Sequence, residues 1–321
     1  MINRLIHAGM IVIILAISNF FISASAQESY PSKPITLLVG YAPGGTSDTS
    51  MRYLANSASK YLGQRVMVVN KEGAGGVVSL SELKSAKPDG YTIAFLATGP
   101  IISAHMRKLP FDVTKDFSPI IQTSIAIYGM AVRSDSEFKT MQDWVKFAAS
   151  NPGKATYSTA GTGSPQHLVM IQLADLLKLD LVHVPTAGGV PAITIMLGGH
   201  VTAASQTTEW KPYVNSNQAR LLALYTAKRI PDYPNTPTLV ELGWNIVAPS
   251  VYSIVGPANM PKERVQKLHD AFRAAMSEQG YIDLLKKVDL QYEYSDPAGL
   301  EKLIISIDQL SSKALKNIPK E

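Results

Sequence analysis

The apolar and polar residues of this chain follow a repeated pattern of strand, glycine-rich loop and amphipathic helix. Residues 35–39 form an apolar run, and Met51, Leu54 and Leu62 follow it at the spacing of one helix face. Further strands are expected at residues 66–69 and 91–96, each followed by a helix. Strands that alternate with helices in this way are typical of a parallel sheet. The first part of the chain therefore predicts an α/β fold.

The same pattern recurs in the second half. A strand at residues 155–158 enters a loop rich in glycine, and Ser164 followed by Pro165 is a typical helix start. Another strand is expected at residues 181–184 before the glycines at 188 and 189. The second half thus repeats the loop chemistry of the first half without repeating its sequence.

Two strand-like stretches, residues 120–132 and 246–255, are expected to connect the halves as long strands. This layout predicts a second lobe, residues 129–251, inserted into a first lobe made of residues 27–128 and 252–321. Two tandem α/β domains fit the same pattern, and length alone does not choose between the two arrangements.

The first 26 residues have the features of a secretory signal peptide. Arg4 precedes an apolar stretch at residues 10–22, and Ala24-Ser25-Ala26 fits the small-residue cleavage rule, so the mature chain is expected to begin at Gln27. An uncleaved membrane anchor is the alternative, although the apolar stretch is short and interrupted for a span of about 20 residues. The prediction is an exported protein.

Composition excludes several classes of function. The chain has 321 residues and no cysteine, which rules out disulfides, thiol catalysis and a cysteine zinc site. The net charge of +5 comes from bases scattered along the chain, which gives nucleic acid binding little support. A mildly basic exported protein fits an acidic small-molecule partner.

The loop Tyr41–Asp48, with the sequence YAPGGTSD, stands between the first strand and its helix. Its glycines allow backbone amides to approach a ligand, and the start of the helix adds unpaired N–H groups and a partial positive charge. The loop therefore predicts binding of a carboxylate or phosphate. Pro43 and Asp48 are expected to shape the loop, although Asp48 could instead face a polar group of the ligand.

Known cofactor and catalytic motifs do not fit. Gly161 and Gly163 begin a dinucleotide motif, but Gln166 stands where its third glycine is needed, and no P-loop occurs. No GxSxG or HExxH sequence is present, so we predict no catalytic residues, no metal and no cofactor. His183 is expected to be a packed histidine. His167, in the first turn of its helix, could bind an anion or hold its loop.

Five segments occur in order that together resemble the Bug, or TctC-type, extracytoplasmic solute receptors of tripartite tricarboxylate transporters. The similarity covers residues 30–315. The segments are YAPGGTSD at 41–48, NKEGAGG at 70–76, KPDGYT at 87–92, STAGTGSPQHL at 158–168 and VPTAGGVPA at 184–192.

The resemblance implies a two-lobed periplasmic binding protein, type II-like, whose lobes are mostly parallel sheets flanked by helices. A small carboxylate would lie in the cleft between the lobes, held largely by backbone amides and small hydroxyls. The residues implied as the first grip are Tyr41, Gly44, Gly45, Thr46 and Ser47, with Thr98 and Gly99 nearby. Those implied as the second grip are Ser158, Thr159, Gly161, Thr162, Gly163 and Ser164, with His167 as a possible member and Thr186, Ala187 and Gly188 on the flank.

Thr186, Ala187, Thr202 and Gln206 depart from the residue types that are frequent in the family, so the particular carboxylate does not transfer. The resemblance also implies a monomer in the periplasm that delivers its ligand to membrane permease subunits. Two alternatives remain open, namely an exported α/β hydrolase or lyase acting on a carboxylate, and a receptor that serves a signalling partner.

Overall fold

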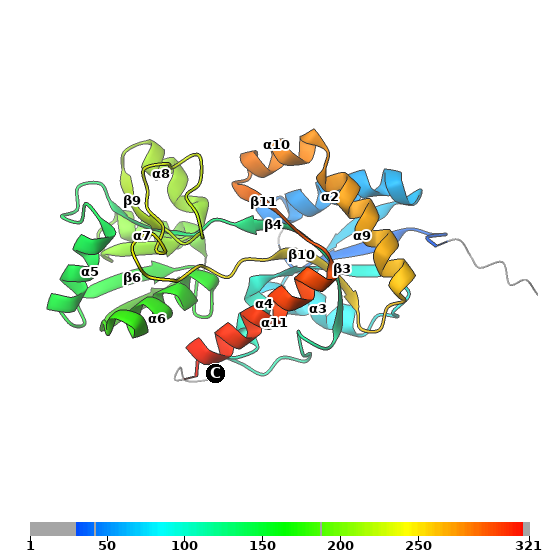
Figure 1. The fold of residues 1–321 in the computed structure, drawn as a ribbon, viewed down its shortest axis with the longest axis horizontal. Coiled ribbons are helices and arrows are strands. Elements are labelled where there is room, and N and C mark those ends of the chain that lie inside the picture. The colour runs from blue at the N-terminus through cyan, green and yellow to red at the C-terminus, as the bar shows by residue number, and fades with distance from the viewer. Residues whose placement is uncertain (1–29, 42, 187, 317–321) are drawn as a thin grey trace, which may run out of the picture.

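The computed structural model describes residues 30–41, 43–186 and 188–316, which form two lobes connected side by side (Figure 1). The predicted signal peptide at 1–26 and the predicted contact at Ala187 lie outside these described residues. Each lobe is built on one sheet, with six strands in the first lobe and five in the second.

The sheet of the first lobe has the strand order β11-β4-β10-β3-β1-β2. Its strands are β1 (Ile35–Val39), β2 (Val66–Asn70), β3 (Thr92–Ala97), β4 (Phe117–Ala126), β10 (Tyr252–Pro257) and β11 (Leu290–Ser295). β1 pairs in parallel with β2 and β3, whereas β10 and β11 pair antiparallel with their neighbours. The sheet is therefore mixed, with the parallel strands coming from the consecutive strand–loop–helix units.

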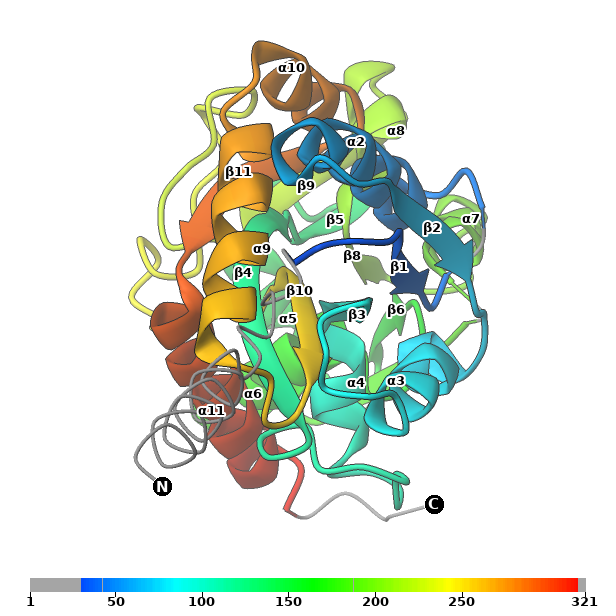
Figure 2. The same cartoon turned by 90° about the vertical axis from the view of Figure 1, so that its right-hand side faces the viewer.

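Helices cover both faces of this sheet (Figure 2). Because successive side chains of a strand point to opposite faces, Leu37 and Ile93 pack with helices on one side while Leu38 and Ala94 pack with helices on the other. On the first side lie α2 (Thr46–Leu62), α9 (Lys262–Met276) and α10 (Gln279–Lys287), and on the second lie α3 (Val77–Lys84), α4 (Thr98–Ser103) and α11 (Pro297–Ala314).

The sheet of the second lobe has the order β7-β6-β8-β5-β9. Its strands are β5 (Gly129–Arg133), β6 (Ala155–Thr159), β7 (Leu181–Pro185), β8 (Ala203–Gln206) and β9 (Ala219–Leu224). β6, β7 and β8 are parallel, and β5 is antiparallel to β8 and β9. The helices are α5 (Met141–Ser150), α6 (Pro165–Leu177), α7 (Gly189–Leu197) and the short α8 (Lys211–Asn215).

The chain passes between the sheets at two places, Ile127–Tyr128 and residues 225–251. The expected single strand over residues 120–132 is wrong, because β4 ends at Ala126 and β5 begins in the other sheet. Likewise, residues 246–251 precede β10 and do not belong to it. The predicted lobe boundaries stay a prediction, which the membership of the strands in the two sheets supports.

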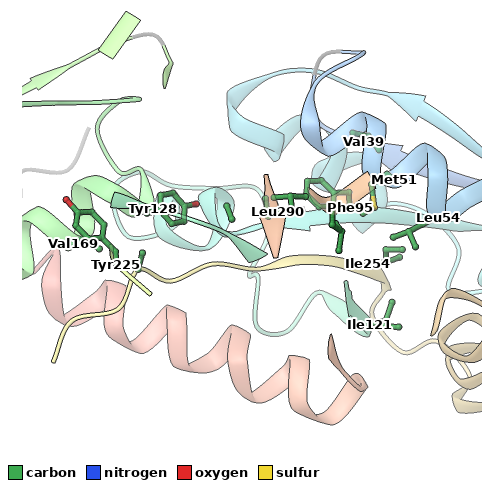
Figure 3. Packing of buried hydrophobic residues seen from close by; sticks show 14 of the residues in the cluster. Val39, Met51, Leu54, Phe95, Ile121, Tyr128, Val169, Tyr225, Ile254 and Leu290 are labelled. Carbon is green, nitrogen blue, oxygen red and sulfur yellow. The ribbon is translucent and has the colours of Figure 1, made fainter. Parts of the chain in front are cut away.

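One hydrophobic core runs through both lobes. Tyr128, at the first crossing, belongs to the same buried cluster as Tyr225 of the second lobe and Phe95 and Leu290 of the first (Figure 3). Its backbone oxygen accepts a hydrogen bond of 2.9 Å from the Tyr225 amide. The crossing is therefore a packed and hydrogen-bonded part of the core.

Candidate functional site

The carboxyl ends of the parallel strands bring the glycine-rich loops of each lobe to one edge of its sheet. In the first lobe, the loops after β1 and β2 are joined by the Tyr41 hydroxyl, which donates to the Gly75 oxygen at 3.0 Å. In α/β sheets, ligands bind at this edge of the strands. A cavity at this edge of the first sheet is lined by residues of both lobes.

A buried carboxylate organises the first loop. Asp48 is 2 % exposed, and it accepts hydrogen bonds from the Gly44 amide at 2.9 Å, Arg52 Nε at 2.8 Å and Asn70 Nδ2 at 2.7 Å. Burial alone would raise the pKa of Asp48, but these hydrogen bonds outweigh it and lower that pKa. Pro43 precedes the bonded amide and is exposed. Asp48 thus connects the first loop to α2 and to the end of β2, and whether it also faces a ligand stays a prediction.

The helix behind this loop begins without a side-chain cap. Its N-cap is Gly45, with φ −70° and ψ 168°, and no side chain of the described residues accepts from its first amides there. Gly44 has φ +80°, a left-handed conformation that favours glycine. The start of α2 therefore keeps unpaired N–H groups and a partial positive charge, the features that bind anions.

A cavity of about 330 Å³ lies at this helix start and is lined by both lobes. The lining residues are Tyr41, Gly45, Thr46, Ser47, Ala126, Thr207, Thr208, Glu209, Tyr252, Val288, Asp289 and Leu290. Four residues of the predicted first grip are among them. Gly44 adjoins the cavity through Gly45 and is exposed.

Three tyrosines lie close together beside this cavity. Burial raises the pKa of Tyr41, Tyr128 and Tyr252 above the ordinary value for a phenol; repulsion from ionised Tyr252 raises the pKa of Tyr41 and Tyr128 further, and the charge of Glu209 raises that of Tyr252. Their hydroxyl groups are therefore neutral at physiological pH. A neutral phenol can both donate and accept a hydrogen bond; the Tyr41 hydroxyl, which donates to Gly75, can still accept one from a polar ligand.

Most hydroxyl groups of the second predicted loop make hydrogen bonds within the protein. Ser158 is fully buried and donates to the Ala192 oxygen at 2.8 Å, and Thr159, also fully buried, contacts His183 Nε2 at 2.8 Å. Ser164 caps α6 by accepting from the His167 amide at 3.4 Å. The structure thus places these three hydroxyls within the lobe, away from the described lining of the cavity.

His167 and His183 stack with their ring centres 3.8 Å apart. His167 Nδ1 accepts from the Gly163 amide at 3.1 Å, which requires an unprotonated nitrogen. Burial, with His183 adding to it, lowers the pKa of His167 to about 3, and burial lowers the pKa of His183 to about 4. Both rings are neutral at pH 7. His167 therefore holds the loop from within, and a ligand contact by this residue stays a prediction.

The remaining predicted residues take intermediate positions. Gly163 is buried against the first lobe, because a Cβ there would lie 2.4 Å from the Met106 sulfur. Gly161 is half-buried and Thr162 exposed. Thr98 is buried and accepts from the Val251 amide at 2.9 Å, with Gly99 beside Tyr41.

On the flank, Thr186 ties the ends of two strands together. Its hydroxyl contacts the backbone oxygens of Thr159 at 2.9 Å and Gly188 at 2.7 Å. Gly188 is the N-cap of α7, at φ +140°. These contacts give Thr186 and Gly188 a role in holding the loop, and a ligand contact by either residue stays a prediction.

Sequence reasoning missed the lining residues Thr207, Thr208, Glu209, Tyr252 and Asp289. A signal for three of them was present, because residues 207–209 follow the third parallel strand, β8, at the same sheet edge as the two glycine loops. Tyr252 and Asp289 come from the last part of the chain, and only the folded structure brings them to the cleft.

Among the described residues no group of three or more His, Cys, Asp or Glu could hold a metal ion. No helix in the described part of the chain is long and apolar enough to span a membrane.

Comparison with known proteins identifies the family. The model of the family described as "Tripartite tricarboxylate transporter family receptor" matches residues 50–318. A curated relative, "UPF0065 protein in gbd 5'region" of Cupriavidus necator, is 39% identical over 289 residues, covering 90% of this chain and 88% of that protein.

Solved structures agree. A TctC solute binding protein from Polaromonas has a TM-score of 0.81 at 28% identity, covering 90% of this chain and all of that one. The periplasmic binding protein BugD has a TM-score of 0.74 at 25% identity, covering 91% of this chain and 100% of the other. MatC from Rhodopseudomonas palustris, solved with bound malate, has a TM-score of 0.74, covering 89% of this chain and 100% of MatC. At 24% identity, this likeness shows the fold alone.

The predicted resemblance and the two-lobed α/β fold are confirmed, with the refinement that both sheets are mixed and not mostly parallel. A family of solute receptors accounts for a cavity lined by residues of both lobes. The chain belongs to the tripartite tricarboxylate transporter receptor family, as a solute-binding receptor of the TctC and Bug type.

Proposed function

We propose that this receptor captures a small organic carboxylate between its lobes in the periplasm and delivers it to the membrane permease subunits of a tripartite tricarboxylate transporter. The observation that carries the proposal is the uncapped start of α2, which opens into the cavity between the lobes. Backbone amides that point at a carboxylate make charge-assisted hydrogen bonds and need no buried basic side chain.

The ligand is proposed to contact Gly45, Thr46 and Ser47 from the first lobe and Thr207 and Thr208 from the second. These residues line one cavity of about 330 Å³, a size suited to a small molecule. Gly161 and Thr162, the more accessible part of the second loop, are proposed to complete the site. A ligand that contacts both lobes favours the closed arrangement only by its differential affinity for it.

A receptor for a transporter and a receptor for a sensor would use the same cleft. The family match favours the transporter, since the family is described by its transporter. It also disfavours an enzyme. MatC, which shares the fold, was solved with malate, a carboxylate, although the ligand of this chain has to be argued from its own cleft.

A thermal-shift screen of the purified mature protein tests the proposal. The probes are di- and tricarboxylates, aromatic carboxylates and amino acids, with a neutral sugar as control. A ligand at 100 times its dissociation constant should stabilise the folded state by about 2.7 kcal/mol. Stabilisation by the sugar and by none of the carboxylates would overturn the proposal, and turnover of a hit compound would indicate an enzyme instead.

A further inference from the structure

Glu209 places a negative charge on the wall of the cavity that is proposed to bind a carboxylate. Its side chain is half-buried and belongs to the second-lobe lining together with Thr207 and Thr208. A carboxylate is the least expected group in an anion site, because like charges repel one another strongly when they are shielded from water. Its presence therefore says something about the ligand.

The fold makes room for this carboxylate. The Thr207 hydroxyl donates to Glu209 Oε2, and a Cβ on Gly189 would lie 2.5 Å from Glu209 Oε1. Gly189 is the first residue of α7, so the carboxylate also lies at the positive end of a helix. These contacts fix where the charge lies, and they leave it in the lining of the cavity.

No basic side chain of the described residues lies within 4 Å of Glu209. The second carboxylate of the lining, Asp289, is paired with Lys211 at 2.5 Å, and Lys211 also contacts Asp232 at 2.9 Å. As far as the chain is described, the lining thus contains one carboxylate in an ion pair, one without an ion pair, and no basic side chain. Glu209 of the second lobe lines the same cavity as Tyr41 and Tyr252 of the first, and its charge adds to the rise in the pKa of Tyr252.

A plain dicarboxylate would meet an amide-rich wall at α2 and a negative wall at Glu209. A molecule that carries both a carboxylate, for the amides at α2, and a protonated amine, for Glu209, would complement both walls. We propose that the ligand is a carboxylate that also carries a protonated amine, with the carboxylate at the start of α2 and the ammonium group against Glu209. This inference rests on the proposed function and narrows its ligand class.

The test compares matched ligands that differ only in the amine. Calorimetry measures the binding of L-aspartate against succinate and of β-alanine against propionate, to the wild-type protein and to Glu209→Gln. The control variant is Glu137→Gln, which changes the net charge equally at an exposed position of the same lobe. We expect the amine-bearing ligand of each pair to bind the wild type and the control at least tenfold more tightly than its partner without the amine. In Glu209→Gln this ratio of dissociation constants should fall at least tenfold.

Equal or weaker binding of the amine-bearing ligands by the wild type would overturn the inference and leave the proposed function intact. An unchanged ratio in Glu209→Gln would do the same, and a lower melting temperature with that unchanged ratio would assign Glu209 to the support of α7. If the wild type binds neither these ligands nor any other carboxylate, the proposed function itself fails, and this inference fails with it.

Discussion

The two glycine-rich loops have similar residue types and different structures. Each follows a parallel strand and precedes a helix, but the first helix begins at Gly45 without a side-chain cap, whereas the second begins at Ser164, whose hydroxyl accepts the His167 amide. The first loop is exposed from Pro43 to Thr46, while Gly163 of the second is buried against Met106. Only the first loop is in the described lining of the cavity.

The difference shows that a helix start preceded by glycines is an anion site only if its own side chains leave the amides free. A serine N-cap satisfies one of these amides from within the chain, and a glycine N-cap leaves it to the ligand or to water. The internal supports differ as well. A buried carboxylate, Asp48, holds the first loop, and a neutral imidazole, His167, holds the second.

The largest effect on ligand binding is expected from a side chain that obstructs the first loop. Gly45 has φ −70°, which any residue adopts, so Gly45→Val should fold while its side chain occupies the cavity in front of the amides. We expect at least a 100-fold loss of affinity for a carboxylate identified by the screen, which corresponds to about 2.7 kcal/mol. Calorimetry gives the affinity and circular dichroism checks the fold.

Gly243→Val is unsuitable as a control, because Gly243 has φ +87° and any side chain there is strained. Val78→Ala, at an exposed residue of the first lobe, is a better control and should bind normally. Undiminished affinity in a folded Gly45→Val protein would exclude the first loop from the site.

Acidification should affect the two loops differently, because Asp48 and His167, which hold them, titrate in different pH ranges. The folded pKa of His167, about 3, is below its unfolded value near 6.5, so its contribution to stability is complete above pH 6.5 and falls as the pH drops toward 3. Between pH 6.5 and 5 we expect a loss of about 2 kcal/mol from this residue. The pKa of Asp48 is lowered, so its contribution is present above the unfolded value near 3.9 and is lost only below it.

Urea unfolding at pH 6.5 and pH 5 checks this expectation. His167→Asn should show a smaller decrease in the free energy of unfolding than the wild type, by at least about 1 kcal/mol. His200→Asn, at an exposed histidine of the same lobe, should behave as the wild type. An equal decrease in all three proteins would show that His167 is not the group that titrates.

The smallest effect is expected from the cap of the second loop. Ser164→Ala removes the hydroxyl that accepts the His167 amide, which should cost about 1 kcal/mol of folding stability. The dissociation constant of the ligand should change less than about threefold, since about 0.65 kcal/mol would be needed for more. A tenfold loss of affinity at unchanged stability would instead place Ser164 in contact with the ligand.

The local units of the fold were predictable, and the assembled site was only partly so. The strand at Ile35–Val39, its loop and its helix follow from hydrophobic spacing, and four residues of that loop line the cavity. Ser158 and Thr159 were expected at the ligand because the family resemblance implies them there; in the fold both hydroxyls are buried and hydrogen-bond within their lobe, and a ligand contact by either residue stays a prediction. Tyr252 approaches the first loop only through an antiparallel pairing of β10, which no local pattern contains.

The single core that passes through Tyr128 has a thermodynamic consequence. Its buried side chains contact one another in an unbroken series from Phe95 and Leu290 of the first lobe to Tyr225 and Val169 of the second. Unfolding one lobe would therefore expose apolar surface of the other, which couples the two lobes into one cooperative unit. A ligand that contacts a few residues in the cleft then raises the free energy of unfolding of the entire chain.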